Sequence, residues 1–223
     1  MNSTVKDVMS THVVAVRPAA PYKEMAAMLH NQRVSGFPVV DEANKVIGVV
    51  SETDLLPKEA MEGTVPRTLQ TLARQRVRAQ VNALTAADLM TRPAVTIGPD
   101  ELVSHAARLM FSQHVKRLPV VSADGTLIGI VTCSDVLSVY NRPDADIHHA
   151  VTQDLILGTF LCDPDRFTVT VHGGVVTIEG MPESTAVGYD IIGAIRHMEG
   201  VVSVHDRLTY PSQKAYHPIV AGR

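Results

Sequence analysis

Two copies of one short polar motif are the residues of this sequence best suited to bind a ligand. They are Ser51-x-x-Asp54 and Thr132-x-x-Asp135, and each follows an apolar run. A helix that begins at such a serine or threonine offers free backbone N–H groups and the positive end of its dipole, which suit a phosphate. The aspartate one turn further could accept two hydrogen bonds from a ribose diol. These groups together indicate nucleotide binding.

The same two motifs also have a purely structural interpretation. Ser/Thr-x-x-Asp before an apolar run is a capping-box pattern, which satisfies the first N–H groups of a helix without any ligand. Such a cap is worth about 1 kcal/mol. Both roles are compatible, because a phosphate can share a capped helix terminus, and the sequence leaves both open.

The motifs belong to an internal repeat, which organises the first two thirds of the chain. One offset, 88 − 7 = 81 residues, relates the two copies without a gap. It relates three pairs of segments: Asp7-Val8-Met9 and Asp88-Leu89-Met90, Pro38-Val39-Val40 and Pro119-Val120-Val121, and Ile47–Ser51 and Ile128–Thr132. Chance similarity would not keep one register over about fifty residues, so a duplication is indicated.

Each copy predicts the same order of elements. Apolar periodicity indicates a short strand, an amphipathic helix, a buried strand, a turn, a second strand and a closing helix. The expected strands are residues 13–16, 37–40 and 46–50 in the first copy, and 94–97, 118–121 and 127–131 in the second. Asn44 and Asp124-Gly125 supply the turns. Neither half has enough apolar surface alone, so the two small sheets are expected to pack together.

The ordered set of Asp-hydrophobic-Met, Pro-Val-Val and Gly-h-h-[Ser/Thr]-x-x-Asp, found twice, resembles the CBS domain. Two in tandem form a CBS pair, or Bateman module, and the resemblance covers roughly residues 1–140. It implies a pseudo-two-fold α+β module of small sheets with packed helices. It also implies a cleft between the repeats that binds AMP, ADP, ATP or a related compound such as S-adenosylmethionine, and association into a homodimer.

Most candidate nucleotide-binding residues lie around the second strand and the closing motif of a copy, and Thr96 lies in the first strand of the second copy. They are Ser35, Gly36, Phe37, Pro38, Ser51, Thr53 and Asp54 in the first copy, and Thr96, Lys116, Arg117, Leu118, Pro119, Thr132, Ser134 and Asp135 in the second. Lys116 and Arg117 could neutralise a phosphate, whereas the first copy has Ser35-Gly36 there. The second copy is therefore expected to be the better-equipped half-site. Gly48 and Gly129 are expected to let the backbone approach a ligand closely.

The segment between the copies, residues 57–84, is too long for an ordinary loop. Apolar residues at helical spacing predict an amphipathic helix with Arg67, Arg74 and Arg78 on its basic face. A helix packed on the module with its arginines in water is the favoured interpretation, and a docking surface for an acidic partner is the alternative. With few charges and no aromatics between them, nucleic acid binding is not expected.

Beyond a polar linker at residues 141–146, the sequence predicts a second, smaller domain over residues 147–211, followed by a tail at 212–223. The order is helix, strand, strand, helix, strand, with Gly173-Gly174 making a tight hairpin turn. The hairpin Val169–Gly180 and the Gly200-Val201 pair resemble the BON domain, an αββαβ fold. CBS pairs and BON domains occur together in bacterial proteins, so a bacterial origin is expected.

The resemblance to BON domains implies binding of phospholipid or a membrane-associated partner. Residues 146–223 carry nine acidic and five basic residues, however, which disfavours anionic headgroups. Contact with an unidentified protein partner is therefore the favoured role, with phospholipid as the minor one.

No residue pattern predicts catalysis or a metal centre. His148 and His149 are adjacent and so point apart on a helix, and no nucleophile or phosphate-loop motif is present. Two cysteines, no signal-like start and no long apolar run favour the cytoplasm. The sequence thus predicts a non-enzymatic regulatory sensor that binds an adenosyl ligand and relays this to its C-terminal domain. The alternative is a ligand-free structural adaptor.

Overall fold

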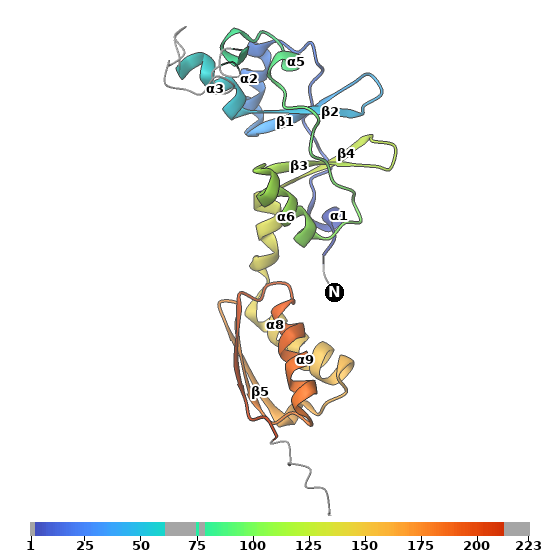
Figure 1. Cartoon of the computed structure of the whole chain (residues 1–223), viewed down its shortest axis with the longest axis vertical. Coiled ribbons are helices and arrows are strands. Elements are labelled where there is room, and N and C mark those ends of the chain that lie inside the picture. The colour runs from blue at the N-terminus through green and yellow to red at the C-terminus, as the bar shows by residue number, and fades with distance from the viewer. Residues whose placement is uncertain (1–2, 61–74, 76–78, 212–223) are drawn as a thin grey trace, which may run out of the picture. The chain divides into compact units, whose positions relative to one another are not determined.

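The computed structural model describes residues 3–60, 75 and 79–211 (Figure 1). It divides into two units, Ser3–Val136 and the part from Leu137 onward. Within these residues the chain is α+β, with three small sheets and helices packed on them. Most of the helix expected within residues 57–84, including its three arginines, lies outside the described residues, as does the tail.

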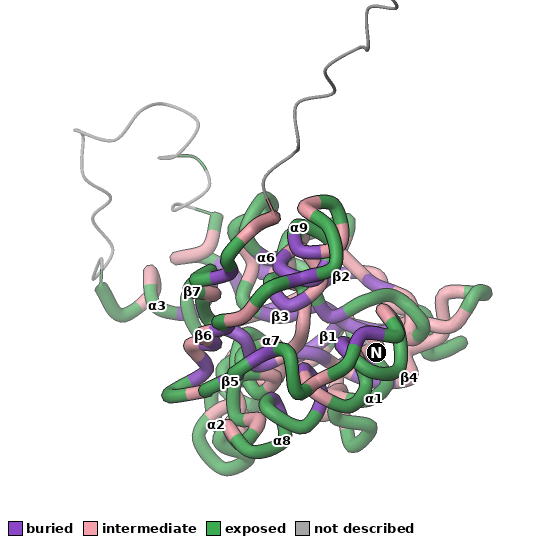
Figure 2. The backbone as a smooth tube through the Cα atoms, turned by 90° about the horizontal axis from the view of Figure 1, so that it is seen from below, coloured by how far each residue is buried: buried purple, intermediate pink, exposed green. Residues whose placement is uncertain are grey.

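Two antiparallel hairpins form the centre of the first unit. Their strands are β1 (Gly36–Val40), β2 (Val46–Ser51), β3 (Arg117–Val121) and β4 (Leu127–Thr132). The pairing registers are equivalent, with Gly36 opposite Ser51 and Arg117 opposite Thr132. Asn44 and Gly125 adopt the positive φ angles, 61° and 87°, that the tight turns require. Strands β1 and β3 are buried almost throughout (Figure 2).

Helices surround these hairpins in equivalent places. They are α1 (Val5–Val8), α2 (Tyr22–Gln32), α3 (Glu52–Ala60), α5 (Ala86–Leu89), α6 (Val103–Gln113) and α7 (Cys133–Leu137). The closing helices α3 and α7 begin directly after Ser51 and Thr132, as the motifs predict. The expected first strands are shorter than predicted: within residues 13–16 and 94–97, only Val16 and Ile97 pair, each by one parallel bridge to β1 or β3.

The two repeats exchange their first segments. Helix α1 of repeat 1 places Val5 in the core of repeat 2, beside Leu118 and Val131. Helix α5 places Ala86 and Leu89 in the core of repeat 1. Backbone bridges Ser10–Ile130 and Val49–Thr91 fix the exchange reciprocally, which is the signature of an approximate two-fold axis between the repeats.

The exchange gives a different reason for glycine at positions 48 and 129 from the expected close approach of a ligand. A Cβ at Gly48 would lie 2.6 Å from the Met90 sulfur, and one at Gly129 would lie 2.5 Å from the Met9 sulfur. The missing side chains therefore make room for the methionine that follows the exchanged helix. The expectation of ligand approach at these glycines is wrong for that reason.

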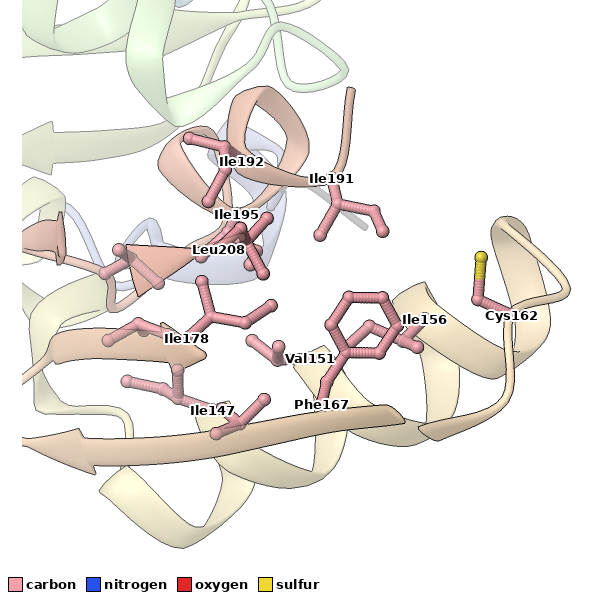
Figure 3. Close-up of a cluster of buried hydrophobic side chains, with 13 residues drawn as sticks. Ile147, Val151, Ile156, Cys162, Phe167, Ile178, Ile191, Ile192, Ile195 and Leu208 are labelled. Atoms are coloured by element: carbon pink, nitrogen blue, oxygen red, sulfur yellow. The ribbon is translucent and has the colours of Figure 1, made fainter. Parts of the chain in front are cut away.

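The second unit has the predicted order of helix, hairpin, helix and strand. Its elements are η1 (Ser138–Asn141), α8 (Asp144–His149), the π-helical η2 (Ala150–Thr159), η3 (Pro164–Arg166), β5 (Phe167–His172), β6 (Val175–Gly180), α9 (Thr185–Arg196) and β7 (Ser203–Leu208). Strand β6 is central, antiparallel to β5 and parallel to β7. Figure 3 shows Ile147, Ile156, Ile178 and Ile195 gathered in one buried cluster between helices and sheet.

Residues 141–146, which the sequence suggests as a linker, contain regular structure. Asn141 ends η1 and Asp144 begins α8. The Asp144 carboxylate accepts hydrogen bonds from the Gly173 and Gly174 N–H groups at 2.7 and 2.9 Å. These bonds lower the Asp144 pKa and fasten the start of α8 to the hairpin turn, whose glycines have φ angles of 56° and 75°.

Candidate functional site

Two pockets open on the first unit, where the two repeats meet. The larger has a volume of about 370 Å³ and the smaller about 260 Å³. Each takes its acidic motif from one repeat and the start of the buried strand from the other. The larger pocket combines Asp54 with Lys116, and the smaller combines Asp135 with Gly36.

Most residues that line the larger pocket have an equivalent, 81 residues away in the sequence, that lines the smaller pocket. Apolar walls come from Ala94, Val95 and Val115 in the larger pocket, and from their counterparts Val13, Val14 and Val34 in the smaller. Thr91 and Ser10 are equivalent hydroxyl groups near the exchanged segments. Both pockets therefore have an apolar side suited to a planar base and a polar side suited to ribose and phosphate.

The acidic motifs are formed as helix caps. In repeat 1, the Asp54 carboxylate accepts from the Ser51 N–H at 2.9 Å and from the Ser51 hydroxyl at 2.7 Å. In repeat 2, Asp135 accepts from the Thr132 N–H and hydroxyl, both at 2.7 Å. Asp54 also accepts from the Gln80 side chain at 3.3 Å. Each motif thus caps its helix while it lines a pocket.

Arg117 lies between the two pockets and lines both. Only 9% of it is exposed, and its Nη2 donates to the Ser35 hydroxyl at 2.7 Å. Burial lowers the pKa of this guanidinium, and the nearby carboxylate of Glu52 acts in the opposite direction. An arginine nevertheless stays protonated at neutral pH, so Arg117 places a buried positive charge at the junction of the repeats.

Gly36 is what makes space for that charge. A Cβ at Gly36 would lie 2.5 Å from Arg117 Nη1 and 2.6 Å from the Val50 carbonyl oxygen. The equivalent place in repeat 2 is Arg117 itself. The two equivalent positions therefore differ: repeat 2 has a long cationic side chain at Arg117, and repeat 1 has no side chain at Gly36.

The candidate residues divide into those that line the pockets and those that do not. The larger pocket is lined by Ser35, Ser51, Thr53, Asp54, Lys116 and Arg117, and the smaller by Ser35, Gly36, Arg117, Thr132 and Asp135. The remaining candidates line neither pocket. Phe37, Pro38, Leu118 and Pro119 are buried in β1 and β3, Ser134 is exposed on α7, and Thr96 precedes the bridge at Ile97.

The expected grouping of the cations changes accordingly. Lys116 and Arg117 make the second copy the half-site expected to be better equipped, but Lys116 lines the pocket that contains Asp54 of the other repeat. Several lining residues are absent from the candidates, among them Glu52, Thr91, His114 and Arg33. For Thr91, the signal was available, because the offset pairs it with a second hydroxyl, Ser10. For the others, no local pattern distinguishes a lining residue from a surface one.

Neither a metal centre nor a membrane helix occurs in the part of the chain that the structure describes. Within these residues, no cluster of three or more His, Cys, Asp or Glu side chains could hold a metal ion. Among the described helices, none combines the length and apolar character needed to cross a membrane.

Comparison with known proteins places the first unit among characterised folds. The CBS domain profile matches residues 5–59 and 86–142. Chloroplastic CBS domain-containing protein CBSX1 of Arabidopsis thaliana is 32% identical over 133 residues, which cover 55% of this chain and 56% of that protein. The chain thus aligns with little more than half the length of that relative.

Two solved structures resemble the same part of the chain. A crystal structure of CBSX2, an A. thaliana protein, in complex with AMP has a TM-score of 0.54 and 33% identity, covering 60% of this chain and 93% of that one. The CBS domain pair of protein MJ0100 in complex with 5′-methylthioadenosine and S-adenosyl-L-methionine has a TM-score of 0.51 and 26% identity. It covers 63% of this chain and 98% of that one.

Proposed function

Because the chain belongs to the CBS-domain family, we propose that its tandem repeats bind an adenosine-containing ligand in the larger pocket and act as a regulatory sensor. The observation that carries this proposal is the lining of that pocket. It brings the Asp54 carboxylate, the Lys116 ammonium group and an apolar wall at Val95 to one place. These suit ribose, phosphate and adenine respectively, and the volume of 370 Å³ lies within the range of roughly 300–1,000 Å³ typical of small-molecule sites.

AMP is the ligand we propose to test first, with S-adenosylmethionine as the competing ligand. AMP is bound by the CBSX2 structure, and S-adenosylmethionine and 5′-methylthioadenosine by the MJ0100 pair. All three share the adenosine that Asp54 and the apolar wall would recognise. Lys116 and Arg117 favour the member with a negative charge, since hydrogen bonds from cationic side chains to phosphate are charge-assisted.

The test is calorimetric titration of the full chain with AMP and with S-adenosylmethionine. We expect AMP binding by the wild type, weakened about tenfold or more in Asp54→Ala because a hydrogen bond to a charged group is worth about 1.5–3 kcal/mol. Asp124→Ala is the matched control, since Asp124 is exposed on the β3–β4 turn and lines neither pocket. Absence of binding of either ligand by the wild type would contradict the proposal.

The alternative function is a structural adaptor that binds no nucleotide. One observation favours it: Asp54 and Asp135 are already engaged as helix caps, an arrangement that needs no ligand. The same titration separates the two functions. If the wild type binds neither AMP nor S-adenosylmethionine, the motifs serve as caps alone.

For the second unit, we propose a BON-like interaction domain that contacts a protein partner and receives the ligand signal. Its αββαβ order and its central β6 support this assignment. The proposal gives the chain no catalytic step, and it includes a homodimer formed through the CBS pair. Hydrogen exchange tests the relay: AMP should alter exchange in β5–β7 as well as around the pocket. Exchange confined to the pocket would contradict a relay, because a ligand shifts an equilibrium only when it binds two states differently.

A further inference from the structure

The two pockets share part of their walls. Of the residues that line them, Ser35 and Arg117 line both. The Arg117 guanidinium is buried, donates to the Ser35 hydroxyl at 2.7 Å, and lies over the bare backbone of Gly36. The same buried cation is therefore available to a ligand on either side.

Each pocket also has a cation of its own. Lys116 lines only the larger pocket and Arg33 only the smaller. An anionic ligand in one pocket would attract the shared guanidinium in addition to the cation that lines only that pocket. The N–H donors of the guanidinium are few and one nitrogen already bonds Ser35, so donors engaged by an anion on one side are lost to the other, and the charge they neutralise attracts a second anion less strongly.

We infer that the two pockets are coupled through Arg117, so that an anionic adenosyl ligand in one lowers the affinity of the other for a second anion. This inference rests on the proposed function, since it concerns regulation of the same site. Coupling between sites is reciprocal, so the effect has one magnitude in both directions. An uncharged ligand such as adenosine does not compete for the guanidinium and escapes the coupling.

The experiment measures the affinity of the smaller pocket for AMP in two situations: when the larger pocket is filled, and when a substitution weakens binding to the larger pocket. In the wild type, the second AMP binds while the larger pocket is occupied. Asp54 lines only the larger pocket, so in Asp54→Ala the smaller pocket binds AMP with the larger one largely empty. We expect the second AMP to bind the wild type about five- to tenfold more weakly than AMP binds Asp54→Ala, within the usual range of coupling. A second step too weak to detect in the wild type, with binding retained in Asp54→Ala, would mean stronger coupling of the same sign.

Two controls assign the effect to the charge at Arg117. The affinity of the smaller pocket for adenosine should be the same in the wild type with its larger pocket filled and in Asp54→Ala. In Arg117→Gln, which keeps a donor for Ser35, AMP should bind both pockets more weakly. Adding Asp54→Ala to this variant should then leave the affinity of the smaller pocket for AMP unchanged. Circular dichroism and thermal unfolding establish that this variant is folded.

The outcomes separate this inference from the proposed function. Equal second-pocket affinity in wild type and Asp54→Ala would overturn the coupling while leaving AMP binding intact. Absence of any AMP binding in Asp54→Ala would also overturn it, since the smaller pocket would then not be a site. A difference that persists in Arg117→Gln would remove Arg117 from the coupling. Failure of the wild type to bind AMP at all would instead contradict the proposed function.

Discussion

Residues 35–36 and 116–117 occupy equivalent places in the two repeats and differ completely in chemistry. Repeat 1 has a hydroxyl and a glycine before its buried strand, and repeat 2 has two cations. Because each pocket joins the acidic motif of one repeat to the strand start of the other, Lys116 of repeat 2 lines the Asp54 pocket, and Arg117 lines both pockets. The difference teaches that the chemistry of a duplicated fold belongs to the junction of the repeats rather than to either copy.

The acidic motifs, by contrast, remain similar. Both aspartates cap their helices through the preceding serine or threonine at 2.7 Å. In repeat 2 the box is reciprocal, since the Asp135 N–H donates back to Thr132 Oγ1 at 3.3 Å. In repeat 1, the Ser51 hydroxyl lies 2.7 Å from that of Thr53. The duplicated scaffold has thus kept its caps and diverged where a ligand's phosphate would lie.

The largest effect is expected from giving Gly36 a side chain. In Gly36→Ala, the new Cβ would lie 2.6 Å from the Val50 carbonyl and 2.8 Å from the Ser51 Cα, both backbone atoms that cannot move aside. We expect the first unit to lose about 3 kcal/mol of stability, measured by urea unfolding.

Gly98→Ala is the matched control, because the nearest atom to its Cβ would be Glu101 Cγ at 3.6 Å. It should unfold close to the wild type. If Gly36→Ala is as stable as this control, the close approach of β2 to Gly36 is wrong.

A smaller effect is expected from removing Lys116, the lysine that lines only the larger pocket. Lys116→Ala should weaken AMP binding about tenfold and leave adenosine binding nearly unchanged, because a lysine contributes to phosphate recognition through its charge. Calorimetry at low and high salt measures both, and the loss should shrink as salt screens the charge. Lys45→Ala on the β1–β2 turn is the control. An equal loss for AMP and adenosine would place Lys116 away from the phosphate.

The smallest effect concerns the caps of the exchanged helices. Hydrogen bonds from the Thr4 hydroxyl and N–H lower the Asp7 pKa, and those from Thr85, with the Leu84 N–H, lower the Asp88 pKa. Because the pKa of each carboxyl is lower in the folded state, the carboxylate stabilises the fold at pH values above its ordinary pKa of about 3.9. That stabilisation is lost as the pH falls through the lower pKa of the folded state.

Asp7→Asn and Asp88→Asn should therefore destabilise the first unit slightly at pH 7. The Asp88 variant should lose more, because Asp88 also accepts from Leu84. Urea midpoints at pH 7 and pH 3 measure the effect, and the variants should converge with the wild type at the lower pH. A gap that stays constant with pH would mean that the carboxylate charge contributes nothing.

Local sequence patterns predicted the repeat, its hairpins, its capped helices and the order of elements in the second unit. Each depends on neighbouring residues, such as Asn44 at a turn or Ser51 before a helix. The exchange of α1 and α5 was not predicted, because it depends on which core Val5 enters, and periodicity does not encode that choice. For the same reason, the sequence does not indicate that Lys116 of repeat 2 lines the pocket of Asp54 in repeat 1. Phe37 and Leu118 are candidates at the starts of the two buried strands, but both are fully buried.

The most direct test of the central claim is a crystal structure of the full chain grown with AMP. We expect AMP in the larger pocket, with its ribose at Asp54, its phosphate at Lys116 and Arg117, and its base against Val95. AMP found only in the smaller pocket, or with its phosphate turned away from Lys116 and Arg117, would contradict it.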